Sequence, residues 1–525
     1  MDLENQDLVK ITYVLSSLIE SKKTEGKSVF AAFIDMSKAF DCINRNLLYF
    51  KLLKNNIGGK ILYAIQELYK DTMSCVQVNG IKTGWFATMQ GVRQGDNLSP
   101  TLFSIYINDL AVELKNLNLG VKMGDLHICI LLYADDIVLV SENEENLQVM
   151  LNHVQNWCVK WQMKVNIEKT KVVHFRSKRK KKSKFAFEID NHKLEISDNY
   201  RYLGVIFDEY LDFDKCAKTL SEAAGRSLGS IITKFKQYKN IGYHTFTKLY
   251  KTGVISILDY GASVWGFGNH KYAQQVQNRA IRYFLGVHKN APNLAIQSEM
   301  GWLNVQYHFY ICAMRYWNRL LKMNGERLAK RMVEYQLINF NANTWCGKLC
   351  AVLEELHKVD YIIDGKLLDL QNIKDDLFYL MHDSWSNNVG FKPKLRNYTK
   401  FKQDINMENY LVKSTRYQRS LLAQLRLGIL PLQVEVGRYY RKPLNERLCV
   451  LCSDQVIEDE CHFLCYCKFY ETEREKFLTV SSNNLSITQV LPPNELFITL
   501  MTSDVTSLLK FVECIWNKRK SALSN

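Results

Sequence analysis

Three aspartates have the types and the spacing needed for metal-dependent phosphoryl transfer. Asp35 directly follows the apolar run 29–34, and Asp135 and Asp136 stand side by side between two further apolar runs. We expect the first run to be a strand that ends at Asp35, and the other two to pair as a hairpin that carries both carboxylates at its tip. Ionised carboxylates next to buried strands need a compensating cation. Two divalent ions held by such groups activate the attacking hydroxyl and stabilise the leaving oxygen.

Each group also has an ordinary interpretation when it is taken alone. Asp35 by itself is typical of a strand end or a helix cap. Asp135-Asp136 by itself fits a solvated turn pair equally well. The combination of all three in one arrangement favours the metal site.

Apolar periodicity predicts the elements that position these carboxylates. Near the N-terminus, strands and helices alternate, and Gly58-Gly59 stops one of the helices. The pattern predicts helices over 7–23, 36–53, 60–70 and 101–114, strands over 29–34, 128–133 and 137–140, and a hairpin with a four- to five-residue loop between 75–78 and 84–87.

Five segments resemble the ordered motifs of reverse transcriptases. Segments 33–41 (FIDMSKAFD), 94–100 (QGDNLSP) and 133–136 (YADD) resemble motifs A, B and C, while 161–171 (WQMKVNIEKTK) and 200–205 (YRYLGV) resemble motifs D and E. Five motifs in the family's order are far more specific than any one of them. The chain is similar in particular to non-long-terminal-repeat (non-LTR), LINE-type retrotransposon proteins of the jockey kind.

The resemblance implies an RNA-directed DNA polymerase that transfers a nucleotide from a dNTP to a primer 3′-hydroxyl with two Mg²⁺ ions. Asp35, Asp135 and Asp136 would be its catalytic carboxylates. Asp35 and Asp135 would be the main Mg²⁺ ligands, joined by the backbone carbonyl of Met36. The implied partners are an RNA template and a DNA primer or target.

The resemblance also implies nucleotide-binding and primer-binding residues. Phe40 stands where the family has an aromatic ring that excludes the ribose 2′-hydroxyl, although it also fits a core position. Gln94 and Gly95 would line the templating base and the incoming nucleotide. Lys169 would protonate pyrophosphate, with Lys171 as its rival, and both lysines also fit a solvated strand end. The turn expected to grip the primer end is formed by Tyr202, Leu203 and Gly204.

The chain departs from the family pattern before Asp35. Only 34 residues precede it, and they are predicted to form one helix and one strand. This leaves no room for the basic fingers strands that hold the triphosphate, or for an upstream endonuclease, so the chain looks like the C-terminal portion of a longer element protein or a truncated gene product. Lost contacts to phosphate charge cost orders of magnitude in rate. The alternative function is therefore a catalytically inactive relic that acts at most as a nucleic-acid-binding protein.

Positive charge is densest between the segments that resemble motifs D and E. Six of the seven residues at 178–184 are cationic, which predicts a surface loop, and the alternatives are a plain solvated loop, a phosphate-backbone contact or nuclear import. The cations are Lys178, Arg179, Lys180, Lys181, Lys182 and Lys184. Further along, helical periodicity from Asp214 predicts a helical thumb, on which Arg279 and Arg282 are candidate phosphate contacts.

A cysteine-rich segment near the C-terminus has the spacing of a zinc site. A Cys-x2-Cys pair is followed by a His-x4-Cys pair, and together they supply three sulfurs and one imidazole. This ligand set is typical of structural Zn²⁺. The predicted ligands are Cys449, Cys452, His462 and Cys467, with Cys461 and Cys465 as alternates and free core cysteines as the competing interpretation. The segment resembles the zinc-binding C-terminal segment of the same retrotransposon proteins, including the acidic run 458–460. Arg447 and Lys468 flank it and suit contact with nucleic acid.

The sequence as a whole predicts an α+β protein of several segments. These are a palm with truncated fingers (1–213), a helical thumb (214–330), a helical connector of unassigned role (331–440) and a zinc-binding segment (441–525) that ends in an amphipathic helix at 505–516. The net charge of +15 suits a polyanionic partner. The lack of a signal-peptide pattern and of a long apolar run predicts an intracellular protein with mostly reduced thiols and no membrane partner. The resemblance to retrotransposon proteins implies that it acts in the nucleus.

Overall fold

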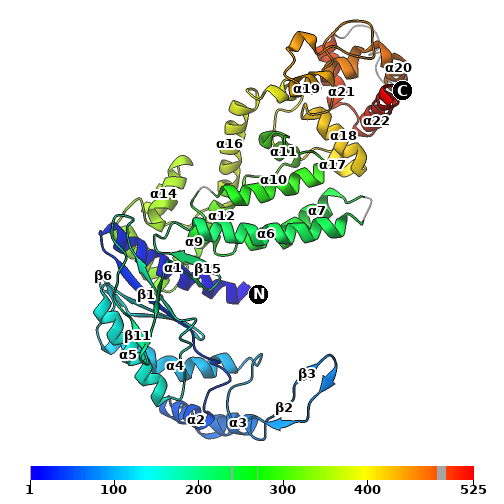
Figure 1. Cartoon of the computed structure of the whole chain (residues 1–525). Coiled ribbons are helices and arrows are strands. Elements are labelled where there is room, and N and C mark those ends of the chain that lie inside the picture. The colour runs from blue at the N-terminus through cyan, green and yellow to red at the C-terminus, as the bar shows by residue number, and fades with distance from the viewer. Residues whose placement is uncertain (1, 238–239, 269, 482–491, 525) are drawn as a thin grey trace. The chain divides into compact units, whose positions relative to one another are not determined.

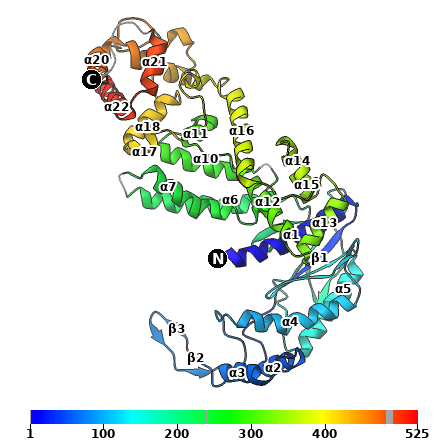
Figure 2. The ribbon, with the colours of Figure 1, turned by 180° about the vertical axis from the view of Figure 1, so that it is seen from behind.

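The computed structural model describes residues 2–237, 240–268, 270–481 and 492–524 (Figures 1 and 2). The chain forms two compact units. Unit 1 comprises Met1–Cys216, Ser263–Gly268 and Tyr316–Leu367, and unit 2 comprises Ala217–Ala262, Asn269–Arg315 and Leu368–Asn525. The segments predicted as thumb and connector therefore each contribute residues to both units. No helix of the described residues is long and apolar enough to span a bilayer.

Unit 1 combines a central sheet with helices. Its helices are α1 (Asp2–Thr24), α2 (Arg45–Lys54), α3 (Gly59–Tyr69), α4 (Ser99–Asn116), α5 (Glu144–Lys160), α13 (Leu328–Ile338), α14 (Trp345–Glu355) and α15 (Asp360–Ile363). Its strands are β1 (Val29–Ile34), β2 (Met73–Ser74), β3 (Gln77–Val78), β4 (Ile81–Lys82), β5 (Phe86–Ala87), β6 (Val121–Met123), β7 (Leu126–Ile128), β8 (Ile130–Tyr133), β9 (Asp136–Ser141), β10 (Lys171–Phe175), β11 (Glu188–Ile189), β12 (His192–Lys193), β13 (Glu195–Ser197), β14 (Asn199–Tyr202) and β15 (Val205–Asp208). The strand predicted over 29–34 and the helices predicted over 7–23, 60–70 and 101–114 are confirmed.

The sheet of unit 1 has five strands in the order β13-β10-β1-β9-β8. β1 pairs antiparallel with both β9 and β10, and β13 joins β10 in parallel. All six residues of β1 are buried. A strand covered on both faces reads as a continuous apolar run, which is the pattern of the sequence 29–34.

Side chains of β1 alternate between the two faces of the sheet. Phe30, Ala32 and Ile34 join the core cluster that α4 and α5 complete. Phe33 points to the other face, where its ring stacks on Tyr200 with centroids 4.4 Å apart. The same alternation assigns the next odd residue, Asp35, to the Phe33 face.

Helix α1 packs against α13 and α14 within unit 1. Tyr13 makes an edge contact with Trp345 at 5.1 Å between ring centroids. The Trp345 N–H donates to Glu20 Oε2 at 2.8 Å, across 325 positions of sequence, and Lys348 forms an ion pair with Glu20 at 2.6 Å. These contacts explain why residues 316–367 belong with the N-terminal part of the chain.

The helix predicted from Met36 begins later than expected. Residues 37–42 form turns, and α2 starts only after Asn44, whose side chain accepts hydrogen bonds from the first helical N–H groups. The reason is tertiary, because the Val92 N–H donates to the Phe40 carbonyl at 2.8 Å and holds this stretch out of a helix.

Two strand predictions are also corrected. The hairpin around Asn79-Gly80 is present, but Val78 pairs with Ile81, so its turn has two residues instead of four or five. Both turn residues have positive φ, 51° and 85°, as an Asn-Gly hairpin turn requires. The apolar run 128–133 is not one strand, since β7 ends before Cys129 and β8 begins after it.

Unit 2 is largely helical. Its elements, together with those that also reach into unit 1, are α6 (Asp214–Phe235), α7 (Tyr243–Tyr250), a π-helical turn (Lys251–Ile255), α8 (Ser256–Leu258), α9 (Ala262–Trp265), α10 (Lys271–Leu285), α11 (Asn293–Met300), α12 (Val305–Leu321), α16 (Leu370–Val389), α17 (Tyr410–Lys413), α18 (Arg416–Arg426), α19 (Gln433–Tyr439), α20 (Glu471–Ser481), α21 (Pro493–Thr502) and α22 (Val505–Ser524), with short 3-10 turns at 393–395, 398–400, 444–446 and 468–470 and a π-helical turn at 462–466. The helix predicted from Asp214 is confirmed, and the terminal helix predicted over 505–516 extends to Ser524.

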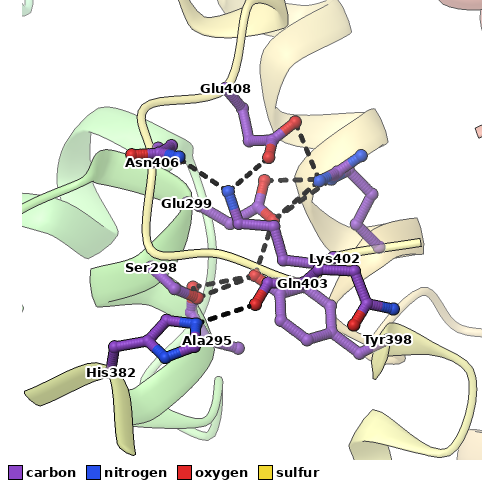
Figure 3. A network of polar contacts seen from close by, with 10 residues as sticks. Ala295, Ser298, Glu299, His382, Tyr398, Lys402, Gln403, Asn406 and Glu408 are labelled. Carbon is purple, nitrogen blue, oxygen red and sulfur yellow. Dashed lines mark hydrogen bonds and ion pairs between the residues drawn. The ribbon is translucent and has the colours of Figure 1, made fainter. Parts of the chain in front are cut away.

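A buried ionic network joins α11 and α18 in unit 2. Arg426 donates from Nε to Glu299 Oε2 at 3.0 Å, and its Nη2 pairs with Glu408 at 2.9 Å. Tyr398 donates its hydroxyl to the same Glu299 at 2.7 Å (Figure 3). The Glu299 side chain is fully buried and that of Arg426 is 4% exposed, so the two charges depend on each other.

Replacing Arg426 with Met is expected to destabilise the protein by about 3–5 kcal/mol, because it leaves the Glu299 carboxylate buried without its partner. The double variant Arg426→Met/Glu299→Gln is expected to recover part of that loss. Urea unfolding followed by tryptophan fluorescence measures both. Arg438→Met is the matched control, since Arg438 is 40% exposed in its ion pair. A loss for Arg426→Met no larger than for this control would contradict the prediction.

Candidate active site and cysteine-histidine cluster

Strand pairing brings the three predicted catalytic aspartates together. Ile34 of β1 pairs with Ile137 of β9, so Asp35 stands one step further along, opposite Asp136. Tyr133 pairs with Asp136, which places Asp135 in the two-residue turn between β8 and β9. The hairpin tip predicted for the two carboxylates is confirmed. The site therefore follows from register alone.

The three carboxylates influence each other electrostatically. Partial burial, together with the negative charges of Asp135 and Asp35, raises the pKa of Asp136 to about 6. Burial, Asp136 and Asp35 together raise the pKa of Tyr200 to about 12, so Tyr200 lies at the same site. The aspartates are not among the groups of described residues whose ligand atoms all lie within 4.8 Å of one another. Their mutual repulsion is what a bound cation would relieve.

The structure distinguishes the two lysines predicted near the site. The Lys169 ammonium lies 3.6 Å from Asp35 Oδ2, and its side chain is 67% exposed. The Lys171 ammonium instead pairs with Glu195 at 2.7 Å. The backbone before Lys169 is held next to the end of β1, since the Asn166 N–H donates to the Asp35 carbonyl at 2.8 Å. Lys169 is thus the lysine that the fold brings to the carboxylates.

The predicted nucleotide-binding residues lie on two loops. The half-buried Phe40 ring stacks on Phe103 of α4 with centroids 5.0 Å apart, so it is also part of the core. Gln94 is exposed, and its side-chain amide donates to Asp41 Oδ1 at 3.0 Å. Gly95 follows on the same exposed loop.

Gly91, whose role was not predicted from the sequence, holds these two loops together. The Gly91 N–H donates to the Ile43 carbonyl at 2.8 Å. A Cβ at Gly91 would meet the Asp41 carbonyl oxygen at 2.7 Å, and φ is +84°, so only glycine fits. The signal was present in the sequence, because a glycine opens the loop that resembles motif B. The missed Tyr200 had a signal too, since it alternates with Tyr202 along one strand.

The predicted primer-binding turn is present between β14 and β15, where Tyr202 pairs with Val205. Its members differ in accessibility. Leu203 and Gly204 are half-buried at the tip, whereas Tyr202 is 1% exposed and its ring lies 5.5 Å from Phe33. Burial, with a contribution from Asp136, raises the pKa of Tyr202. The Tyr202 side chain is therefore a core group.

The basic segment 178–184 forms a loop without helix or strand, as predicted. Three of its cations contact other groups of unit 1. Lys180 donates to the Gly26 carbonyl at 2.6 Å, Lys178 lies 3.8 Å from Asp212, and Lys182 pairs with Asp198. The remaining cations, Arg179, Lys181 and Lys184, are exposed.

Two of the other candidate phosphate contacts serve the fold instead. Arg282 donates to the Ala291 carbonyl at 3.1 Å, and burial lowers its pKa. The Arg447 guanidinium donates to the carbonyls of Lys442 and Val434 at 2.7 and 2.9 Å. Arg279 is exposed on α10, and Lys468 is 69% exposed although it pairs with Asp454.

The four predicted zinc ligands converge in unit 2. The ligand atoms of Cys449, Cys452, His462 and Cys467 all lie within 4.8 Å of one another. The sulfurs of Cys449 and Cys467 are 4.0 Å apart, and the Cys452 sulfur is 3.5 Å from His462 Nε2. Hydrogen bonds from Cys467 and His462 lower the pKa of the Cys449 thiol to about 3. Three sulfurs and one imidazole nitrogen are the donor set of closed zinc sites.

The alternate ligands point elsewhere. Cys461 is hydrogen-bonded to the Pro493 carbonyl at 3.4 Å and interacts with Cys465. Neither belongs to the four-residue group. The geometry thus selects the set that the sequence spacing favoured.

The acidic run before His462 supports the cluster, a role the sequence did not reveal. Glu458 is fully buried in an ion pair with Arg519 of α22. Asp459 accepts the His462 N–H at 2.8 Å. Glu460, also buried, pairs with Arg396. Glu458 and Glu460 thus tie the cluster to two different parts of unit 2, and Asp459 fixes the backbone of the cluster's own histidine.

Comparison with known proteins agrees with this geometry. Residues 4–207 match the family described as reverse transcriptase (RNA-dependent DNA polymerase). This part of the chain is therefore a reverse transcriptase domain, and it contains all three aspartates.

The relatives are proteins of non-LTR retrotransposons. The chain is 25% identical over 273 residues to an RNA-directed DNA polymerase from the mobile element jockey of Drosophila funebris, covering 51% of this chain and 28% of that protein. It is 27% identical over 210 residues to the retrovirus-related Pol polyprotein from the type-1 retrotransposable element R2 of Nasonia vitripennis, covering 38% of this chain and 20% of that protein. The match thus spans less than a third of either relative.

Solved structures give a weaker match. A telomerase structure from Candida albicans aligns over 53% of this chain and 50% of its own chain, with a TM-score of 0.31 and 12% identity. These values are too low to assign a fold.

Proposed function

We propose that the chain is an RNA-directed DNA polymerase of a non-LTR retrotransposon, which transfers nucleotides from dNTPs to a primer 3′-hydroxyl. The observation that carries the proposal is the register of β9 against β1 and β8, which sets Asp35 opposite Asp136 with Asp135 in the adjoining turn. An RNA template and a DNA primer or target are the partners of this activity. The chain acts inside the nucleus, where the target DNA lies.

The residues present fit two Mg²⁺ ions. Hard oxygen donors of the kind that Mg²⁺ prefers are supplied by Asp35, Asp135, Asp136 and the Met36 carbonyl. The three carboxylates repel one another, and a bound cation would offset that repulsion. When bound, the ions polarise the phosphoryl oxygens and lower the pKa of the attacking hydroxyl. Asp35 and Asp135 are the main ligands.

The protein's own groups position the substrates. Lys169, beside Asp35, holds a proton close to where pyrophosphate departs. Phe40, wedged against Phe103, presents a rigid ring to the sugar of the incoming nucleotide, and Gln94 and Gly95 line its base. The turn at 203–204 supports the primer end, and the exposed cations Arg179, Lys181 and Lys184 attract the phosphate backbone.

The cysteine-histidine cluster holds a structural Zn²⁺ in this proposal. Its four ligands are all protein side chains, which leaves no open position for chemistry. The ion keeps the segment 449–467 folded within unit 2. Lys468, exposed beside this segment, is the cation available to a nucleic acid.

Primer extension tests the proposal. The full chain is incubated with poly(rA), an oligo(dT) primer, dTTP and Mg²⁺, beside an Asp135→Asn/Asp136→Asn variant of equal folded content. We expect the unaltered chain to extend the primer and the variant not to. Extension no greater than that of the variant would overturn the polymerase proposal, and salt-dependent RNA binding in the same sample would then identify a nucleic-acid-binding protein.

A further inference from the structure

Unit 2 holds a second group of metal-ligating side chains, outside both sites described above. Asp259, His308 and Cys312 each offer one ligand atom, and these atoms lie within 4.8 Å of one another. Asp259 Oδ2 is already 2.8 Å from His308 Nε2. The polymerase chemistry uses none of the three.

Local structure explains why these residues meet. His308 and Cys312 are four positions apart on α12, so they project from one face of the helix. Asp259 caps the C-terminal end of the short helix α8, and the turn after it is closed by the Ala262 N–H, which donates to the Asp259 carbonyl at 3.0 Å. In the sequence Cys312 looked like an isolated core cysteine, because its carboxylate partner lies some fifty residues earlier.

The group is accessible and incompletely satisfied. The side chains of Asp259 and His308 are 28% and 31% exposed, so an ion could reach them from solvent. Asp259 Oδ1 is buried and has no hydrogen-bond partner among the described residues. The Cys312 side chain is half-buried. An unsatisfied carboxylate oxygen beside an imidazole and a thiol is an arrangement that a cation completes.

We propose that Asp259, His308 and Cys312 form a second transition-metal site, selective for Zn²⁺. Imidazole and thiolate ligands favour Zn²⁺ over Mg²⁺ or Ca²⁺, and the two anionic ligands balance its charge. Three protein ligands leave a fourth position for water, unlike the closed Cys₃His cluster. The ion would link α12 to the turn after α8.

The geometry needs only a small adjustment to accept the ion. Ligands that lie 2.0–2.3 Å from a tetrahedral Zn²⁺ are roughly 3.3–3.8 Å apart. Asp259 Oδ2 and His308 Nε2 must therefore move apart by about 0.5 Å or more. The Cys312 sulfur must come within the same range of roughly 3.3–3.8 Å from both atoms. Burial raises the pKa of the free Cys312 thiol to about 12, so binding would release its proton.

Cobalt titration of the metal-free full chain tests this site, because tetrahedral Co²⁺ absorbs visibly and its thiolate bonds add charge-transfer bands. We expect two equivalents of tetrahedral Co²⁺ in the unaltered chain, counted from the visible bands in excess Mg²⁺ so that ions at the three aspartates are not included, and one in both His308→Gln and Cys312→Ser. The Cys312 variant should also lose one thiolate's share of the charge-transfer intensity. Cys514→Ser, which removes an exposed cysteine of the same unit, is the matched control and should retain two equivalents.

Each outcome bears directly on the proposal. The bands of the Cys₃His cluster report whether a variant is still folded, and the isosteric Asp259→Asn replaces any variant that loses them. One equivalent in the unaltered chain would mean that Asp259 and His308 form only a hydrogen-bonded pair. Two equivalents retained by His308→Gln, Cys312→Ser or Asp259→Asn would place the second ion elsewhere. Either result overturns the site.

Discussion

Replacing Asp35 with Asn is expected to reduce primer extension at least about 100-fold, the effect typical of removing one preorganised electrostatic group from an active site. Asp35 directly follows a strand whose six residues are all buried, and it stands opposite Asp136, so its position is fixed by the fold. Asparagine keeps the shape but removes the charge that holds a divalent ion. Mn²⁺ binding, followed by electron paramagnetic resonance, should weaken in parallel.

The matched control for this variant is Asp190→Asn. Asp190 lies in the exposed turn between β11 and β12 of the same unit, where its carboxylate only accepts a hydrogen bond from Gln155. We expect this variant to retain full extension and Mn²⁺ affinity. Equal activity of Asp35→Asn and Asp190→Asn would remove Asp35 from the site. Weakened Mn²⁺ binding with unchanged extension would assign Asp35 to a metal that the reaction does not need.

The placement of each aspartate within its own segment was predictable because it has short-range determinants. Asp35 is fixed by the strand before it, and Asp135-Asp136 by the turn between two paired strands. The cysteine-histidine set was predictable for the same reason, since all four residues lie within one short segment. The meeting of Asp35 with Asp136 depends instead on the long-range pairing of β1 with β9, which only the order of the five resembling segments implied.

What the sequence did not reveal depends on contacts between distant segments. The late start of α2 follows from hydrogen bonds between the loops at 37–43 and 91–94. Residues 316–367 join unit 1 because Trp345 and Lys348 meet Glu20 of α1. No local periodicity records such pairings, since each partner looks like an ordinary helix residue in its own window.

The sequence also does not reveal which cations are free to contact a nucleic acid and which are used within the fold. Arg447 and Lys468 both flank the cysteine cluster, and a charge pattern treats them alike. The structure separates them, because Arg447 satisfies backbone carbonyls while Lys468 remains mostly exposed. Net charge therefore predicts a polyanionic partner better than it predicts which arginine contacts it.

Removing the ion proposed for the Cys₃His cluster is expected to unfold the segment 449–467. The free energy of unfolding should fall by several kcal/mol. Structural Zn²⁺ contributes apparent values of about 10–16 kcal/mol in isolated zinc fingers, and here protein contacts retain part of the structure. The segment has few helices or strands of its own. Two of its turns are each closed by a single backbone hydrogen bond of 2.9 Å, from the Cys449 N–H to the Val456 carbonyl and from the Cys467 N–H to the His462 carbonyl. Without the ion, these turns keep only such hydrogen bonds and the ion pairs of Glu458 and Glu460 with Arg519 and Arg396.

Hydrogen exchange with mass spectrometry on Cys449→Ser measures the effect. We expect peptides covering 449–467 to lose protection, and α22 to loosen with them, because Arg519 is paired with the buried Glu458 beside the cluster. Cys461→Ala is the informative control: it lies between the ligands but contacts Pro493 instead, so it should keep its zinc and its protection. Protection lost equally in both variants would mean that Cys461 belongs to the ligand set. Protection kept in both would mean that packing, not metal, holds the segment, through buried residues such as Glu458 and Phe463.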